Sequence, residues 1–271
     1  MPRAKAEWTQ DTVRRFMREG RGKGDGKEYK PWFTTHDFPS KGRATRVLGW
    51  KTKRIHHFFS DLQLKYFYLL EWDQSVIDIK EHFPILDLDA VDFYKDDLRL
   101  DKFRDKNSNE SYILCTTFLI TKLDGNGNSK VVARAVKNAS DLNKTITLDK
   151  LEIERRYWKS KGIEWGIITN KNINSIRAKN IEWIHSTLNY EEENDANIVE
   201  LEDLTDAFLY RVSESGEPIR KVILSFEQDY GFDSGKGMLL FKYLIAKRKI
   251  IIDMDKPINL NDGCHILSIA K

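Results

Sequence analysis

The sequence has very few cysteines and no long apolar run. Only Cys115 and Cys264 occur among its 271 residues, too few for a disulfide framework or a cysteine-based zinc site. No apolar stretch reaches the length that crosses a membrane, and the N-terminus, Met1 to Lys5, has no signal-peptide core. We therefore expect a cytoplasmic protein with two free thiols and no membrane segment.

Several catalytic motifs are also missing. The sequence contains no Walker loop, no glycine-rich dinucleotide fingerprint, no His-Glu-x-x-His helix and no nucleophile elbow. It has no internal repeat of the kind that builds a solenoid. These absences argue against the enzyme classes that the motifs define.

The composition is that of a globular chain with an uneven charge distribution. Hydrophobic residues make up 40% and charged residues 32% of the chain, and the net charge is +3. Residues 1–60 hold 15 Lys and Arg against 6 Asp and Glu, whereas residues 191–206 are acidic. The basic front end indicates contacts with phosphate, and the acidic stretch indicates a solvated connector or a protein-binding surface. The length allows two modest domains, which we place at residues 1–170 and 171–271.

Two runs near the middle of the chain predict a β-hairpin. Residues 111–121 and 130–137 are rich in β-branched and apolar residues, and Asp124-Gly125-Asn126-Gly127 lies between them. Asp-Gly and Asn-Gly pairs between such runs are strong hairpin signals. The second strand ends in Lys137, which gives the outline of the metal-dependent hairpin of restriction-endonuclease-type nucleases.

Such a nuclease needs acids that this hairpin does not carry. A strand Asp and a Glu from a preceding helix hold Mg²⁺, which prepares the attacking water, and the lysine acts as a donor or base. The facing strand here offers Thr117, and the preceding helix offers Gln63. Both side chains are neutral, so Lys137 alone of this set is retained.

Elements around the hairpin complete a mixed α/β domain. Ser60 is the expected N-cap of a helix with Gln63 in its first turn, the part of a helix that favours anions. The patterns predict a strand at 76–84, an amphipathic helix at 148–161 and a strand at 165–169. This order predicts a central sheet that carries the candidate site.

Two basic segments precede the helix that Ser60 is expected to cap. The run from Gly20 to Lys27 is glycine-rich and cationic, and either a solvated connector or a contact with the DNA backbone explains it. Residues 43–59 predict two strands ending in His56 and His57, whose side chains point to opposite faces and so cannot both bind one metal. A structural or phosphate-contact role is expected for them. The candidate DNA-binding residues are Arg21, Lys23, Lys27, Lys30, Arg43, Arg54, His56 and His57.

The C-terminal third predicts helices followed by a strand pair. Helices are expected at 174–188, 219–230 and 237–249, and strands at 250–253 and 265–269. Helix, turn, helix, hairpin is the order of a winged helix. The cations near the end of the last helix could meet phosphate, although a solvated edge or a protein-binding surface explains them equally well.

Several sequence blocks together resemble the TnsA family, the endonuclease subunits of heteromeric bacterial transposases. The blocks follow one another from Glu19 to Trp183, and their order and number make the resemblance specific. They are Glu19-Gly20-Arg21-Gly22, Tyr29-Lys30-Pro31-Trp32, Gly42-Arg43, Arg54-Ile55-His56-His57, Ser60-Asp61-Leu62, Glu71-Trp72 through Phe83-Pro84, Thr116 with Phe118-Leu119, Val136-Lys137, Leu151-Glu152-Ile153-Glu154-Arg155-Arg156-Tyr157-Trp158 and Asn180-Ile181-Glu182-Trp183.

The resemblance implies a restriction-endonuclease-like N-terminal domain and a winged-helix C-terminal domain. In this family the protein cleaves the 5′ strands at transposon-end DNA with Mg²⁺. It works beside a DDE transposase subunit (TnsB-like) that cuts the 3′ ends, and an AAA+ regulator (TnsC-like) engages it. Alignment of the blocks places the helix Glu, the strand Asp and the hairpin Lys of the family on Gln63, Thr117 and Lys137. Ala135 stands where some relatives have Gln.

The two neutral residues should weaken Mg²⁺ binding severely, because this ion dehydrates reluctantly and needs anionic oxygens. Three interpretations stay open. The chain is an inactive member kept for binding DNA and partners, or it is partly engineered, or the site is displaced and Asp61 or another nearby acid serves. A rival from another class is a non-catalytic adaptor that binds the AAA+ regulator while the nuclease domain only packs. We favour the inactive subunit.

Overall fold

The computed structural model describes residues 8–37, 43–88, 100–105, 107–187 and 198–270. Its contacts divide the chain into two compact units, residues 1–173 and 174–271. No helix in the described ranges is both long and apolar enough to cross a membrane.

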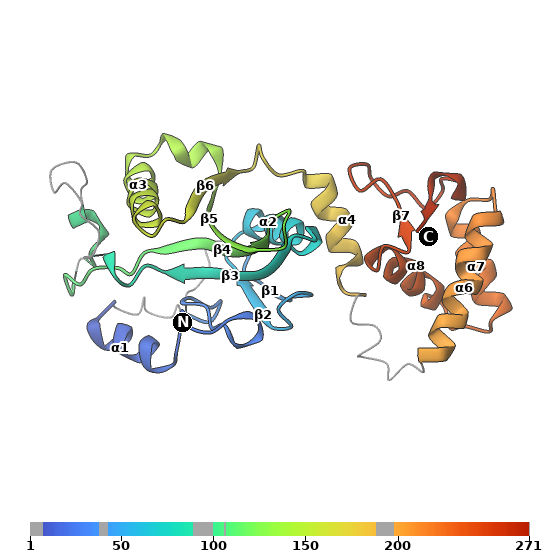
Figure 1. Cartoon of the computed structure of the whole chain (residues 1–271), viewed down its shortest axis with the longest axis horizontal. Coiled ribbons are helices and arrows are strands. Elements are labelled where there is room, and N and C mark those ends of the chain that lie inside the picture. Colours follow the sequence, from blue (N-terminus) through green and yellow to red (C-terminus); the bar gives the residue numbers. More distant parts are fainter. Residues whose placement is uncertain (1–7, 38–42, 89–99, 106, 188–197, 271) are drawn as a thin grey trace, which may run out of the picture. The chain divides into compact units, whose positions relative to one another are not determined.

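A four-stranded sheet in the order β3-β4-β5-β6 lies at the centre of the first unit (Figure 1). β3 (Val76–Pro84), β4 (Cys115–Leu123) and β5 (Ser129–Lys137) are antiparallel neighbours, and β6 (Glu164–Thr169) runs parallel to β5. The predicted mixed α/β domain with a central sheet is confirmed, whereas the strand order and the parallel pairing of β6 were not predicted.

The predicted hairpin between β4 and β5 is confirmed. The carboxylate of Asp124 closes its turn by accepting hydrogen bonds from the backbone N–H groups of Asn126 and Asn128, both at 2.8 Å. The first strand begins at Cys115 and not at residue 111 as predicted. The difference arises because the preceding backbone bonds to distant loops: the N–H of Tyr112 donates to the carbonyl of Phe103.

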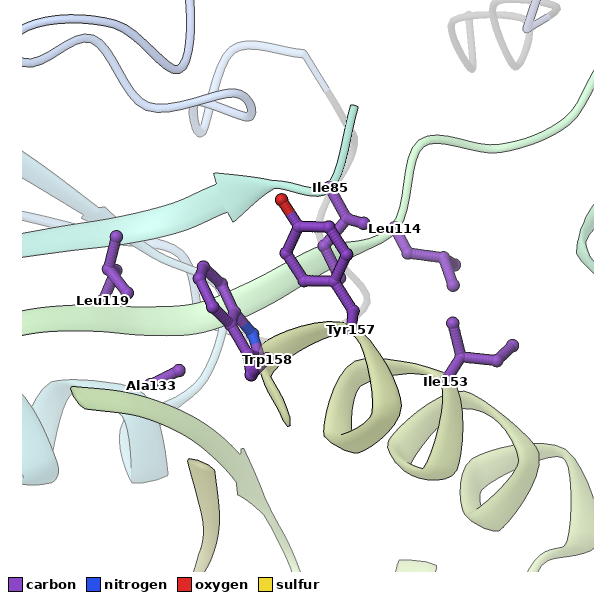
Figure 2. Close-up of a cluster of buried hydrophobic side chains, with 7 residues drawn as sticks. All are labelled: Ile85, Leu114, Leu119, Ala133, Ile153, Tyr157 and Trp158. Carbon is purple, nitrogen blue, oxygen red and sulfur yellow. The ribbon is translucent and has the colours of Figure 1, made fainter. Parts of the chain in front are cut away.

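One face of the sheet is covered by α3 (Thr145–Ser160), the crossover that parallel pairing of β5 and β6 requires (Figure 1). Its apolar side packs Ile153, Tyr157 and Trp158 against Leu119 and Ala133 of the central strands (Figure 2). The predicted amphipathic helix is thus present, and it begins earlier than expected.

The other face carries α2 (Asp61–Trp72) and a two-stranded ribbon, β1 (Thr45–Leu48) with β2 (Ile55–Phe58). An aromatic core joins these layers: the ring centroid of Phe58 lies 4.8 Å from that of Phe67 on α2 and 6.1 Å from that of Phe118 on β4. Both the strand pair and the helix that follows it were predicted.

The N-terminal helix α1 (Gln10–Arg18) packs Phe16 against Trp8 and Trp32 in a smaller apolar cluster. The unit also contains three short 3-10 helices in its described residues, η1 (Gly26–Glu28), η3 (Leu100–Phe103) and η4 (Ala139–Asn143). Residues 89–99, between β3 and β4, lie outside the described residues.

The second unit is built on helices. It contains α4 (Ser175–His185), α6 (Ile198–Glu214), α7 (Ile219–Asp229) and α8 (Lys236–Ala246), followed by a short antiparallel pair, β7 (Ile250–Ile251) and β8 (Ser268–Ile269), with η5 (Cys264–Ile266) before the last strand. The fully buried rings of Phe208, Phe226 and Phe241 form its centre. Helices and strands were predicted at these places, except for α6.

The solvated connector that the acidic stretch predicted is wrong over residues 198–206, because these begin α6, while the alternative of a protein-binding surface stays a prediction. Thr205 and Phe208 are buried on this helix, and Arg211 near its end pairs with Asp229 of α7 at 2.7 Å. Tertiary packing therefore orders a segment whose composition resembles a solvated spacer. Residues 191–197 of the expected connector lie outside the described residues.

Candidate functional site

Thr117 and Lys137 meet at one end of the sheet. The last ladder pair of β4 and β5 is Phe118 with Arg134, and just beyond it the hydroxyl of Thr117 accepts a hydrogen bond from the backbone N–H of Val136 at 3.1 Å. Lys137 follows directly and pairs with Thr169 of β6. The fold therefore brings these two predicted site residues together.

Lys137 is half-buried and forms no ion pair with a described residue. Burial lowers the pKa of its ammonium, and Lys150 lowers it further, whereas Glu154 and Asp141 oppose that shift. Burial thus disfavours the charged form of this ammonium, and an anionic group nearby favours it.

Glu154 is a buried acid that was not among the predicted site residues. It lies on α3 with only 1% of its surface exposed, and its Oε2 atom has no hydrogen-bond partner among the described residues. Burial raises the pKa of this carboxyl, while Lys150 and Lys137 lower it. A signal was present, because Glu154 falls between Leu151 and Trp158 on the apolar side of the helix.

Gln63 forms hydrogen bonds with the residues at the N-terminus of its own helix, α2. Its N–H donates to the Ser60 hydroxyl at 3.3 Å, and its side-chain oxygen accepts from the backbone N–H of Phe59 at 2.9 Å. This reciprocal arrangement resembles a capping box. The amide at this position therefore stabilises the first turn of α2, and Asp61 beside it is exposed.

A chain of contacts connects Gln63 with Thr117. The ring of Phe59, the residue that Gln63 bonds, lies 4.8 Å from the ring of His82. His82 occupies the place opposite Thr117, between the ladder pairs Glu81–Phe118 and Phe83–Thr116. The start of α2 therefore lies near the same end of the sheet.

His82 has a left-handed backbone, with φ of 49°, which is uncommon for a residue with a side chain. This conformation interrupts the side-chain alternation of β3, so that Glu81 and Phe83 point to opposite faces of the sheet. Glu81 points to the side of β2, where it bonds His56, and Phe83 packs on Trp158 of α3 with ring centroids 5.8 Å apart. The imidazole of His82 donates to the carbonyl of His57 at 2.9 Å, and burial lowers its pKa to about 4.

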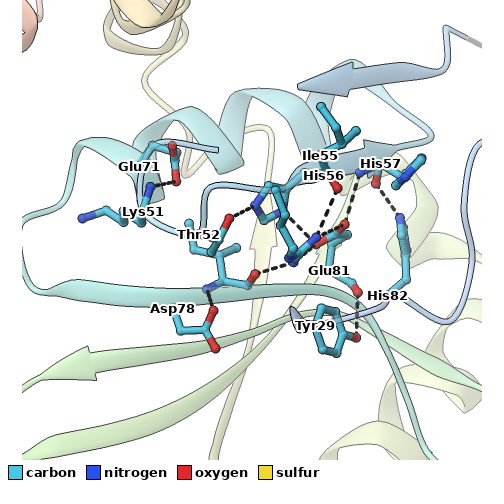
Figure 3. Close-up of polar contacts among 12 residues, drawn as sticks. Tyr29, Lys51, Thr52, Ile55, His56, His57, Glu71, Asp78, Glu81 and His82 are labelled. Carbon is cyan, nitrogen blue, oxygen red and sulfur yellow. Dashed lines mark hydrogen bonds and ion pairs between the residues drawn. The ribbon is translucent and has the colours of Figure 1, made fainter. Parts of the chain in front are cut away.

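Glu81 lies at the centre of a buried polar network (Figure 3). Its carboxylate accepts from both terminal nitrogens of Arg54, at 2.9 and 2.6 Å, and from His56 Nδ1 at 2.8 Å. The backbone N–H of His57 donates to it at 3.2 Å. Burial opposes ionisation, but His56 and Arg54 hold the pKa of Glu81 well below its ordinary value. The network fastens the β1–β2 ribbon to β3.

The predicted DNA-binding residues fall into two groups. Arg54 and His56 are buried in the Glu81 network, and Arg21 bonds Asp37 at 2.7 Å and Glu19 at 2.6 Å. These three hold the fold, and we no longer assign them to phosphate. The residues whose side chains reach the surface are Lys23, Lys27, Lys30, Arg43 and, in part, His57.

The donor set at the sheet end does not fit a divalent metal. Gln63 and Thr117 are neutral, and each accepts a hydrogen bond from the backbone. Within the described ranges, no group of three His, Cys, Asp or Glu side chains lies close enough to hold a metal ion. Mg²⁺ prefers anionic oxygens, and neither Gln63 nor Thr117 supplies one.

Comparisons with known proteins point to one family in both halves of the chain. The family model "TnsA-like endonuclease N terminal" matches residues 73–170, and "TnsA endonuclease C terminal" matches residues 172–254. The chain is 35% identical over 273 residues to "Transposon Tn7 transposition protein TnsA" of Escherichia coli, with 100% of this chain and 96% of that protein covered.

Proposed function

Since the chain belongs to the TnsA family, we propose that it is a DNA- and partner-binding subunit of a Tn7-like transposase that does not itself cut DNA. It holds transposon-end DNA beside a DDE transposase subunit (TnsB-like) and an AAA+ regulator (TnsC-like). The nuclease fold is retained as a scaffold for this assembly.

One observation supports the proposal that this chain does not cut DNA. Both positions that match the acids of the family hold neutral side chains, and the backbone is their partner: Phe59 N–H for Gln63 and Val136 N–H for Thr117. A carboxylate at either position could accept the same N–H and bind a metal, whereas an amide and a hydroxyl bind Mg²⁺ weakly. Lys137 alone cannot replace the missing charge.

DNA binding rests on the exposed cations of the first unit. Lys23, Lys27 and Lys30 lie on one loop that hydrogen bonds close, because Gly22 N–H donates to the carbonyl of Lys30 and Lys30 N–H donates to that of Lys23. A closed loop presents its cations in a fixed arrangement, which favours contact with the regularly spaced phosphates of a duplex.

The second unit is proposed as a winged-helix domain. Two helices, α7 and α8, precede the pair β7–β8, and the Glu227 carboxylate fixes the turn between them by accepting from Gly235 and Gly237 N–H at 3.0 and 2.9 Å. On α8, the ammonium of Lys242 lies 4.4 Å from the ring centroid of Trp183. This cation therefore already has a cation–π partner within the unit. A protein partner is therefore as consistent with α8 as DNA is.

The test is cleavage by the complete complex. The chain is combined with its cognate transposase and AAA+ subunits, transposon-end DNA and Mg²⁺, and 5′-strand breaks are measured together with 3′-strand breaks. We expect 3′ cleavage that depends on the chain being present, without 5′ cleavage. Robust 5′ cleavage that Lys137→Ala abolishes would overturn the proposal.

A second candidate is a nuclease that uses a displaced acid. The observation that favours it is Glu154, whose buried carboxylate has one oxygen without a described partner and lies within electrostatic reach of Lys137. If 5′ cleavage is found, Glu154→Gln and Asp61→Asn separate the two acids. Loss of cleavage in Glu154→Gln alone would assign the acid to α3.

A further inference from the structure

The outer face of the β1–β2 ribbon is exposed and carries an ordered pair of nitrogen donors. Arg46 stands directly opposite His57, and Leu48 stands opposite Ile55, so these four side chains share one face. The other face packs inward, with His56 and Phe58 fully buried. The Glu81 network described above holds this ribbon in place (Figure 3).

The tautomer of His57 is fixed by its neighbours. The backbone N–H of Thr35 donates to His57 Nδ1 at 3.2 Å, and a ring nitrogen that accepts an N–H bond carries no proton. The hydrogen of the neutral ring therefore resides on Nε2. Burial lowers the pKa of His57, which favours this neutral form, and Nε2 has no partner among the described residues.

Arg46 completes the pair through a second histidine. Its guanidinium donates to His36 Nε2 at 3.3 Å, and the rings of His36 and His57 lie 6.2 Å apart in an edge-to-face arrangement. One bond to a neutral ring leaves the remaining N–H groups of the guanidinium available on an exposed side chain. Arg46 and His57 thus present N–H donors from adjacent strands.

The charge of this segment identifies the kind of ligand. Residues 43–60 contain five Lys and Arg (Arg43, Arg46, Lys51, Lys53 and Arg54) and no Asp or Glu. Arg54 is bound to Glu81, and Lys51 donates to the carbonyls of Asp73 and Val76. Arg43 and Arg46 remain exposed. Glu81 lies on the inner side of the ribbon, where Arg54 and His56 bind it, so the exposed donors of the outer face complement a backbone phosphate, which only accepts hydrogen bonds.

We propose that Arg46 and His57 on the β1–β2 ribbon bind a backbone phosphate of duplex DNA, with Arg46 supplying the charge and neutral His57 a directed N–H. The proposal rests on the proposed function, because it assigns DNA binding to a defined surface of the first unit. A phosphate contact of this kind positions the protein on the duplex and reads no sequence.

Substitutions at His57 distinguish a contact with phosphate from a structural role of the ring. His57→Asn keeps an acceptor near the position of Nδ1 for Thr35 and removes the outward donor. His57→Gln places an amide N–H near the position of Nε2. Arg46→Gln removes the charge, and Lys159→Gln, at an exposed position of α3, is a control for the same loss of charge elsewhere.

Binding of a short random-sequence duplex to the full chain is measured by fluorescence anisotropy across a salt series. Arg46→Gln should weaken binding about tenfold and lower the log–log salt slope by about one unit. His57→Asn should weaken binding while His57→Gln retains most of it, and Lys159→Gln should match the parent chain.

The outcomes distinguish this proposal from the broader function. If the parent chain binds no duplex DNA, the DNA-binding function fails. If it binds, and Arg46→Gln and His57→Asn bind equally well, the ribbon assignment alone fails. An equal loss in both His57 variants, accompanied by a lower melting temperature, would mean that the ring only supports the fold.

Discussion

The hydroxyl of Thr117 accepts a hydrogen bond from the backbone N–H of Val136, 3.1 Å away, just beyond the last ladder pair of β4 and β5. A side chain thus takes the place of a strand carbonyl at the position where relatives of this chain are expected to carry an acid. The contact gives Thr117 a structural role that can be measured separately from catalysis.

Thr117→Val should destabilise the chain, because the methyl group that replaces the hydroxyl leaves the buried N–H of Val136 without a partner. We expect a loss of about 1–3 kcal/mol in the free energy of unfolding, measured by denaturant titration. Thr117→Ser should retain most of the stability. Thr121→Val on the same strand is the matched control, since the Thr121 hydroxyl makes no hydrogen bond with a described residue; equal losses at both positions would contradict the assignment.

Gln63→Glu combined with Thr117→Asp should create a metal site. Each carboxylate can accept the present backbone hydrogen bond with one oxygen and offer the other to Mg²⁺. The double variant should be stabilised by about 2.7 kcal/mol when Mg²⁺ reaches 100 times its Kd, seen as a thermal shift that grows with Mg²⁺ concentration. Each single variant should shift far less, because one carboxylate is a poor Mg²⁺ site. A double variant that does not respond to Mg²⁺ would show that these positions do not face each other.

His82 should make stability depend on pH. The folded chain holds this imidazole neutral, with a pKa of about 4 against the ordinary 6.5, so the unfolded chain binds a proton that the folded chain excludes. Stability is therefore lost as the pH falls from about 6.5 to about 4, by roughly 3 kcal/mol, and this contribution is constant below that window. His82→Gln can still donate to the His57 carbonyl and should flatten this part of the profile.

Charge on the glycine-rich loop should affect DNA binding, and Arg21 should affect stability. Replacing Lys23, Lys27 and Lys30 with Ser should lower the log–log salt slope of duplex binding by about one unit for each lost contact. Arg21→Ala should instead lower the melting temperature, because its side chain is only 14% exposed and pairs with Asp37. A triple variant with an unchanged slope would assign the loop to a solvated connector.

Local chemistry made much of the first unit predictable. The hairpin turn at Asp124, the cap at Ser60 and the apolar stripe of α3 are each encoded within a few residues, and each is found where the sequence indicated. The opposite orientations of His56 and His57 also follow from strand geometry alone.

What the sequence could not predict depends on residues that are far apart. Glu81 reads as an exposed strand acid until the fold brings Arg54 and His56 to it. The left-handed backbone of His82 has no local signal such as glycine. The acidic composition before Phe208 concealed the start of α6, because its burial depends on contact with other helices.

The parallel pairing of β5 with β6 has a consequence for synthesis of the chain. β5 is complete at Lys137, but its outer edge stays without a partner until the ribosome has added α3 and residues 164–169. During that interval the apolar strand Val131 to Val136 offers unpaired N–H and carbonyl groups to any other strand. Truncated products ending between Asn138 and Ile163 should therefore aggregate, whereas a fragment ending at Ile173 carries every strand of the sheet.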